Sequence, residues 1–196
     1  DIKRMLAFSS ISHAGFVLAA ILIGTTQATI GIFVYWSLFA IANLGAFGML
    51  WMNRNKDESI EGYTHNTVES YAGLVKKSPM VAAIFAMFLL SLAGLPPFSV
   101  FWGKFYLIGA AVNADYLYLA LIMALNSAVA AYYYIKPIVY MFFKDPIESA
   151  NTQILANSTT MLKSVIGVLV ILTVGSIFLV EPLIEFASYY VQISGY

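Results

Sequence analysis

The sequence predicts an all-α integral membrane protein with five membrane-spanning helices, one of them broken. Three observations predict this class: the composition, the lengths of the apolar stretches and the positions of the basic residues. Hydrophobic residues make up 61% of the 196 residues and charged residues only 10%, and the mean hydropathy is +0.82. A soluble domain carries about 25% charged residues. This composition therefore indicates a chain surrounded by the lipid bilayer.

Composition also excludes several classes of function. Ten basic and ten acidic residues give a net charge of zero, so no basic field favours nucleic acid or an acidic soluble partner. The chain has no cysteine, which excludes disulfides, thiolate metal sites and an iron–sulfur cluster held by cysteines of this chain. No phosphate-binding glycine loop, metal-ligand spacing or nucleophile elbow is present. We therefore expect no metal or cofactor in this chain.

Five stretches are long enough to cross a membrane, for which a helix needs about 20 apolar residues. They are residues 6–23, 30–52, 80–111 (broken at 94–97), 116–143 and 161–180. Residues 53–78 form a long hydrophilic loop, and residues 183–196 are expected to form a short interfacial tail. The cluster Tyr132–Tyr134 is expected at the level of the lipid headgroups. Close approach of a neighbouring helix is predicted by small residues in the second stretch: Ala42, Gly45, Ala46 and Gly48.

The basic residues predict the orientation of the chain. If the stretches alternate in direction, all but one of the ten basic residues fall on one side: Lys3, Arg4, Arg54, Lys56, Lys76, Lys77, Lys136, Lys144 and Lys163. Positive charge gathers on the cytoplasmic side of membranes. We therefore expect a bacterial inner-membrane protein with Asp1 in the cytoplasm and Tyr196 in the periplasm. The exception is Lys104.

Because the chain begins at Asp1 and has no signal peptide, we interpret all 196 residues as one membrane segment of a longer protein whose N-terminal part is missing.

The third stretch contains both a break and a charge. Gly94, Pro96 and Pro97 interrupt it, and Lys104 follows one helical piece later. Irregular backbone is tolerated at membrane depth only where protein or a water-lined cavity satisfies it, and broken helices beside ion sites recur in transporters. We therefore predict a hinge at Gly94, Pro96 and Pro97, with Lys104 carrying protons by alternating between ammonium and amine. The alternative is a lysine that snorkels to the membrane surface.

His13 is the second candidate for proton transfer, because histidine gains and loses a proton near neutral pH. The alternative is a structural histidine bonded to a carbonyl or to a nearby serine. Lys3 is expected to set the topology, with a part in a water path as the other possibility. Structural roles are expected for the remaining polar residues. The hydroxyls of Ser9, Ser10 and Ser12 are expected to bond to carbonyls of their own helix, and Asn43 and Asn126 are expected to link helices. Glu181 is expected to be a solvated carboxylate at a helix end.

Two motifs resemble a known family. Residues 1–16, DIKRMLAFSSISHAGF, resemble a signature of the antiporter-like membrane subunits of respiratory complex I. Residues 91–106 are similar to the second broken helix of that family, and the segment Gly103–Tyr106 is closest to its subunit N type. The resemblance covers most of the chain as far as Lys144. Phe8 and Phe16 stand where the family usually has tyrosines.

The resemblance implies a fold of fourteen helices in two inverted five-helix repeats, with this chain as helices ten to fourteen. It implies a proton-translocating subunit of NADH:quinone oxidoreductase, with Lys104 as the terminal lysine of the channel and His13 on its hydrophilic axis. Redox chemistry would take place in partner subunits, which would hold FMN, iron–sulfur clusters and quinone, and this chain would hold no redox site. The implied partners are the other membrane subunits of complex I.

Two other functions stay open on the sequence. One is a multi-subunit cation/proton antiporter of the same fold. The other is a non-transporting membrane scaffold, in which Lys104 pairs with a carboxylate of a neighbouring subunit. A scaffold role does not explain the helix break at Pro96 and Pro97.

Overall fold

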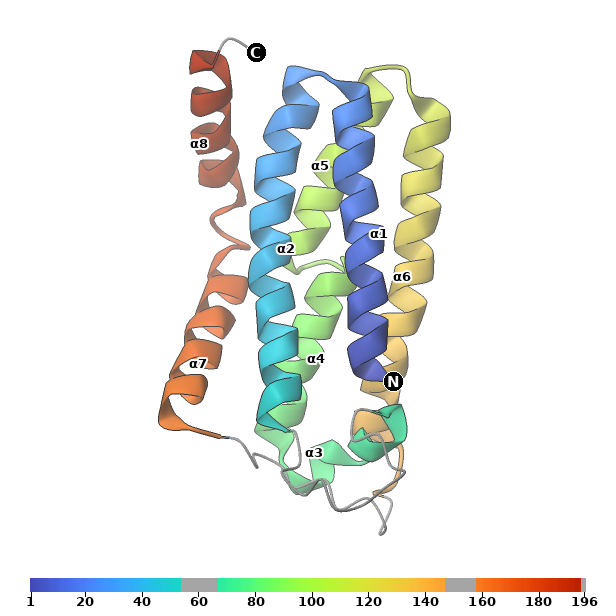
Figure 1. The fold of residues 1–196 in the computed structure, drawn as a ribbon, viewed down its shortest axis with the longest axis vertical. Helices are drawn as coiled ribbons and strands as arrows, with labels where there is room; N and C mark the ends of the chain where they lie inside the picture. Colours follow the sequence, from blue (N-terminus) through green and yellow to red (C-terminus); the bar gives the residue numbers. More distant parts are fainter. Residues whose placement is uncertain (54–66, 147–157, 195–196) are drawn as a thin grey trace.

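The computed structural model describes residues 1–53, 67–146 and 158–194, and within these ranges the fold is helical, with no strand (Figure 1). The all-α class predicted from the sequence is confirmed. Half of the predicted loop at 53–78, including Arg54 and Lys56, lies outside the described residues. The elements, in chain order, are α1 (Ile2–Ile23), α2 (Thr26–Met52), the 3-10 helix η1 (Val68–Tyr71), α3 (Leu74–Lys77), α4 (Pro79–Ala93), α5 (Ser99–Asn113), α6 (Leu117–Phe143), α7 (Thr160–Gly175) and α8 (Val180–Ile193).

Local sequence signals set the ends of α1 and α2. The side chain of Asp1 accepts a hydrogen bond from the Arg4 N–H at 2.9 Å and caps the start of α1. Gly24 ends that helix in the left-handed conformation, with φ of +66°. Thr25 then accepts a hydrogen bond from the Ala28 N–H at 3.2 Å and starts α2. A cap at each side of the turn allows α1 and α2 to lie antiparallel (Figure 1).

Helix α2 is the central helix of the described fold, since it packs against α1, α4, α5, α7 and α8. Its small residues permit this, as expected. A Cβ added to Gly45 would clash with the ring of Phe88 on α4. A Cβ added to Gly48 would lie 3.5 Å from Cγ1 of Ile166 on α7. Glycine thus lets two helices approach α2 closely.

Helices α4 and α5 occupy the stretch predicted as a broken span, and each is 15 residues long. Figure 1 shows the chain leaving helical conformation between them about halfway along α2. Pro79 occupies the first turn of α4, where its missing N–H costs nothing. Gly94 ends α4 with φ of +75°, and the Pro96–Pro97 peptide bond is cis. The break predicted at 94–97 is therefore present.

A short connection closes the end of the bundle near α3. The Gly73 N–H donates to the carbonyl of Tyr140 on α6 at 3.1 Å. The Lys76 ammonium donates to the Asp145 carboxylate at 2.6 Å, and this pair is exposed to solvent. The hydrogen bond from Lys76 holds the pKa of Asp145 below its usual value of 3.8.

Tyr71 is 1% exposed in this connection, and burial raises the pKa of its hydroxyl well above the usual range. Tyr71 thus packs in the interior of the bundle.

The last part of the chain differs from the expected span at 161–180 with an interfacial tail. Residues 160–175 form α7, and residues 180–193 form α8 rather than a tail. The two helices are bent by 87° at a short break, and both lie along α2 (Figure 1). Ala187 and Val191 of α8 are buried, whereas Phe186 and Tyr190 are exposed, so α8 packs on α2 through part of its apolar surface.

The number of five membrane spans is not confirmed. Three helices, α1, α2 and α6, are individually long and apolar enough to cross a membrane, and the bent pair of α7 and α8 makes a fourth if it counts as one span. Helix α4 is apolar but short. The crossing by α4 and α5 therefore stays a prediction, and so do the boundaries of the individual spans.

Candidate functional site

Lys104 lies in α5 and is only 4% exposed. Its Nζ donates hydrogen bonds to the carbonyl oxygens of Ala93, at 3.0 Å, and of Leu92, at 3.3 Å. These carbonyls belong to the last turn of α4, where the helix dipole places partial negative charge. The side chain thus points to the break in the helix rather than to the membrane surface, which contradicts the snorkelling alternative.

The main chain at the break leaves two carbonyls of α4 for Lys104. A helix ends with four carbonyls that have no partner within the helix. The carbonyl of Leu90 accepts from the Leu95 N–H at 3.3 Å, and that of Ser91 accepts from the Gly94 N–H at 3.0 Å. The two prolines that follow have no N–H to offer. The Lys104 ammonium therefore supplies the hydrogen bonds that the backbone does not provide to the last two carbonyls of α4.

His13 lies in α1, is 2% exposed and bridges two other helices. Its Nδ1 lies 2.6 Å from the hydroxyl of Tyr35 on α2, and its Nε2 lies 3.3 Å from the hydroxyl of Tyr134 on α6. Its ring also stacks on Phe39, with ring centroids 4.3 Å apart. Both ring nitrogens thus have a partner that can donate or accept a proton. The partners are thus tyrosine hydroxyls, and not the carbonyl or serine expected for a structural histidine.

The ring of Phe16 contacts both the lysine and Tyr35, a partner of the histidine. The Lys104 ammonium is 5.7 Å from the ring centroid of Phe16, which follows His13 by one helical turn. Phe16 in turn contacts Tyr35, with ring centroids 5.6 Å apart. Gly103 makes this arrangement possible, because a Cβ there would lie 3.0 Å from Cα of Tyr35. Lys104 and His13 therefore share neighbours without a direct hydrogen bond.

Polar contacts continue from His13 along α1 and α6. The Asn126 amide donates to the Ser12 hydroxyl at 2.8 Å, so Asn126 links helices as expected. Ser9 bonds back to the carbonyl of its own helix at 2.7 Å, as predicted. The expectation of the same back-bonding for Ser12 is wrong, because its hydroxyl joins α1 to α6 instead.

No carboxylate balances Lys104 within the described part of the chain. There, one ion pair lies within 4 Å, between Lys76 and Asp145. No group of three or more metal-ligating side chains lies together in the described ranges. The arrangement consists of a buried ammonium, an imidazole, phenols and hydroxyls. Such groups can exchange protons.

The structure places the remaining predicted residues as follows. Gly94, Pro96 and Pro97 form the break next to Lys104. Lys3 is exposed at the start of α1, ten residues or about 15 Å of helix before His13, so it lies apart from the buried cluster. Glu181 is exposed in the first turn of α8, as expected for a helix-end carboxylate.

Two site residues were missed from the sequence. Tyr35 and Tyr134 are both 0% exposed. Tyr134 faces the interior of the bundle, whereas Tyr132, at 76% exposed, faces outward. The headgroup level expected for this cluster stays a prediction. The signal available was the helical spacing of Tyr134 with Ala130 and Pro137, which places it on the buried face of α6.

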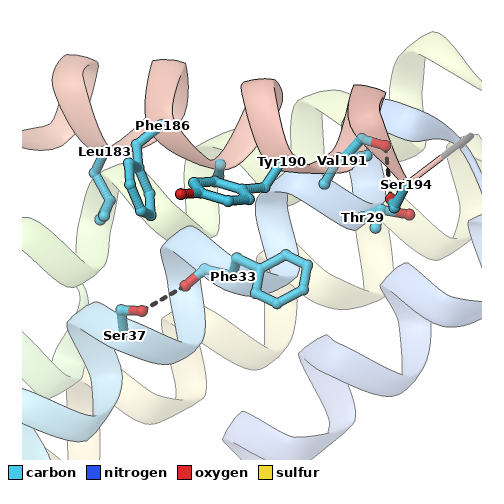
Figure 2. Close-up of a pocket in the computed structure, with 9 residues that line it drawn as sticks. Thr29, Phe33, Ser37, Leu183, Phe186, Tyr190, Val191 and Ser194 are labelled. Carbon is cyan, nitrogen blue, oxygen red and sulfur yellow. Dashed lines mark hydrogen bonds between the residues drawn. The ribbon is translucent and has the colours of Figure 1, made fainter.

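A pocket of about 560 Å³ lies elsewhere, between α2 and α8. Figure 2 shows Phe33 on one side and Phe186 and Tyr190 on the other. Two serines at its edge bond to the carbonyls of their own helices, Ser37 at 2.8 Å and Ser194 at 2.7 Å. The pocket is mostly apolar and contains no charged side chain. It is therefore separate from the cluster around Lys104 and His13.

These features define a class: an α-helical membrane protein in which a broken helix presents its carbonyls to a buried lysine. The chain belongs to the NADH:quinone oxidoreductase/Mrp antiporter membrane family, whose sequence model matches residues 1–130. Among curated relatives, it is similar to the NADH-quinone oxidoreductase subunit N of Sulfurimonas denitrificans, with 54% identity over the whole chain, and to that of a Sulfurovum species, with 50% identity over the whole chain. The chain spans 39% of the length of each of these relatives.

Solved structures share the fold. A chain of respiratory complex I from Thermus thermophilus, with bound aureothin, matches with a TM-score of 0.74 and 27% identity, over 93% of this chain and 39% of that one. A chain of the Mrp complex from a Dietzia species matches with a TM-score of 0.68 and 19% identity, over 95% of this chain and 43% of that one. The second match shows the fold alone. Both agree with an antiporter-like membrane fold.

Proposed function

We propose that this chain is the C-terminal part of a proton-translocating membrane subunit of NADH:quinone oxidoreductase. The observation that carries the proposal is the position of Lys104. Its ammonium is buried, is held by two carbonyls at a helix break and has no carboxylate partner among the described residues. A charge held in this way at membrane depth marks an ion path more often than a structural contact.

Lys104 is suited to hold and release one proton. As an ammonium it donates to the carbonyls of Leu92 and Ala93, and as an amine it loses one donor and gains a lone pair. His13 is the second group on the path, because Tyr35 and Tyr134 contact its two ring nitrogens. The hydrogen bonds of Lys104 and those of His13 go to different partners, and no bond joins the two groups directly in the described residues. Proton transfer between them therefore requires water or movement of a side chain.

The wider assignment rests on the relatives. The curated relatives described above are named subunits N of NADH-quinone oxidoreductases. We infer that other membrane subunits of complex I are the partners, and that FMN, iron–sulfur clusters and quinone belong to partner subunits. Electron transfer there would drive proton movement in this chain. Lys3 would then contribute to topology or to a water path at the start of α1.

We infer a location in the bacterial inner membrane, with Asp1 on the cytoplasmic side and Tyr196 on the periplasmic side. The described basic residues other than Lys104 support this orientation. They lie at or near the start of α1, in α3, toward the end of α6 and near the start of α7, and these segments meet at one end of the bundle (Figure 1). Positive charge on one side of the membrane indicates the cytoplasm.

A cation/proton antiporter is the second candidate, and the shared fold with an Mrp complex chain is the observation that keeps it open. At 19% identity, that likeness carries no information on the transported ion. A membrane scaffold is disfavoured, because it requires Lys104 to reach a carboxylate of a neighbouring subunit. The Lys104 side chain instead points inward to α4.

Replacement of Lys104 in the full assembly tests the proposal. We expect Lys104→Ala and Lys104→Arg to reduce proton uptake into sealed vesicles at least tenfold, measured during electron transfer from NADH to quinone. Arginine preserves the positive charge but does not release its proton. The Lys104→Arg variant therefore tests whether pumping requires proton exchange and not only a positive charge. Full pumping in Lys104→Ala would overturn the relay. Transport that depends on sodium and not on quinone would favour the antiporter.

A further inference from the structure

The hydroxyl of Ser91 is buried without a partner. Ser91 lies in the last turn of α4 and is 0% exposed, and its Oγ has no hydrogen-bond partner in the part of the chain that the structure describes. Other helical serines in this protein bond back to a carbonyl of their own helix: Ser9, Ser10, Ser37, Ser164 and Ser188. A buried polar group left unpaired costs about 1–3 kcal/mol. The Ser91 hydroxyl therefore requires a partner.

Lys104 has an unused donor at the same end of α4. An ammonium group has three N–H donors, and two of them are used by the carbonyls of Leu92 and Ala93. The Phe16 ring is too distant for a hydrogen bond, with 5.7 Å between its centroid and Nζ. Ser91 directly precedes Leu92 in the chain. The unused N–H of Lys104 and the unpaired hydroxyl of Ser91 thus both lie at the last turn of α4.

We propose that a water molecule bridges Lys104 Nζ and Ser91 Oγ, and that Ser91 is a positioning residue for proton exchange at Lys104. Buried waters are held by two to four polar partners, and these two groups supply the minimum. The hydroxyl of Ser127 is likewise buried without a partner among the described residues, on α6, which packs against α4. A second unpaired hydroxyl thus lies on a helix that packs against the helix of Ser91. This inference rests on the proposed function of Lys104.

The water gives Lys104 a proton partner in both of its forms. The ammonium donates its third N–H to the water oxygen. After that proton moves to the water, the amine lone pair accepts a hydrogen bond from the water. One N–H bond breaks and one O–H bond forms, and the positive charge moves with the proton. Because Ser91 lies on α4, the water connects Lys104 to the half of the broken span nearest to α3 (Figure 1).

A structural test uses the intact assembly of the wild-type protein. A cryo-electron microscopy map that resolves ordered water is expected to show a peak within about 2.6–3.2 Å of both Lys104 Nζ and Ser91 Oγ. The peak is expected to remain in Ser91→Thr and to disappear in Ser91→Ala. A wild-type map with ordered water elsewhere and no peak at this position would overturn the proposal, whether or not the variants assemble.

A functional test compares Ser91→Ala with Ser91→Thr and with Ser37→Ala. Ser37 is an exposed serine of α2 that bonds to its own helix. We expect Ser91→Ala to lower the protons translocated per electron pair at least threefold, Ser91→Thr to restore them, and Ser37→Ala to leave them unchanged. Lys104→Ala is measured alongside. Normal pumping in Lys104→Ala refutes the proposed function, whereas loss in Lys104→Ala with normal pumping in Ser91→Ala refutes the role of Ser91 alone.

Discussion

Gly94 and Lys104 are in such close contact that a Cβ added to Gly94 would lie 2.8 Å from Cδ of the lysine and 2.9 Å from its Nζ. Gly94 also has a φ of +75°. The glycine therefore has two functions, to turn the chain at the end of α4 and to leave space for the lysine. These functions are separable, because Gly24 has a φ of +66° and nothing nearer than 3.8 Å to an added Cβ.

We predict that Gly94→Ala impairs proton translocation and Gly24→Ala does not. Alanine in the left-handed region costs about 1–2 kcal/mol at either position, so both variants lose similar backbone stability. Only at Gly94 does the added methyl group displace Lys104 from the carbonyls of α4. Proton uptake per electron pair in vesicles, normalised to the amount of assembled complex, measures the difference. Equal effects of the two substitutions would contradict this interpretation.

The two tyrosines at His13 predict unequal effects. Tyr35→Phe removes the partner of Nδ1 at 2.6 Å, and Tyr134→Phe removes the more distant partner of Nε2 at 3.3 Å. An unpaired buried nitrogen costs about 1–3 kcal/mol, and we expect the larger loss of thermal stability in Tyr35→Phe. Tyr132→Phe is the control, because Tyr132 is 76% exposed. A loss as large in the control would show that the hydrogen bonds to His13 are not the cause.

The packing of α2 against α4 predicts a loss of stability in Gly45→Ala. The added methyl group would clash with the ring of Phe88, which is 0% exposed. Overpacking of this kind costs about 1–3 kcal/mol. Gly109→Ala in α5 meets nothing within 4 Å, and we expect it to stabilise the helix by about 0.5–1 kcal/mol. Thermal unfolding of the purified assembly in detergent distinguishes the two, and similar unfolding temperatures would refute the prediction.

The exposed pair of Lys76 and Asp145 predicts a dependence on pH. The pKa of Asp145 lies below 3.8 in the folded protein, chiefly because Lys76 donates a hydrogen bond to its carboxylate. A lowered pKa means that the pair stabilises the fold above about pH 3.8 and that this contribution is lost as the pH falls through the folded-state pKa. We expect Lys76→Ala to return the Asp145 pKa to about 3.8, as measured by NMR titration of labelled aspartate. An unchanged pKa would exclude Lys76 as the cause.

The sequence by itself determined the class of protein and the place of the break. Composition alone indicates a membrane protein, because so few charged residues cannot cover the surface of a soluble domain. Two adjacent prolines after Gly94 cannot continue a helix, since they lack the N–H groups that the ladder needs. Lys104 was recognisable as a candidate because an isolated charge in an apolar stretch is costly in lipid. Each of these conclusions depends on local chemistry.

Only the tertiary structure decided which groups meet. Tyr35 and Tyr134 reach His13 from two other helices, and 121 residues separate His13 from Tyr134 in the chain. The carbonyl partners of Lys104 depend on how α5 folds back on the end of α4. Residues 183–193 belong to a helix that packs on α2, with Ala187 and Val191 buried. These contacts join helices, and helix packing is set by shape and small residues on several segments together, which no single stretch of sequence specifies.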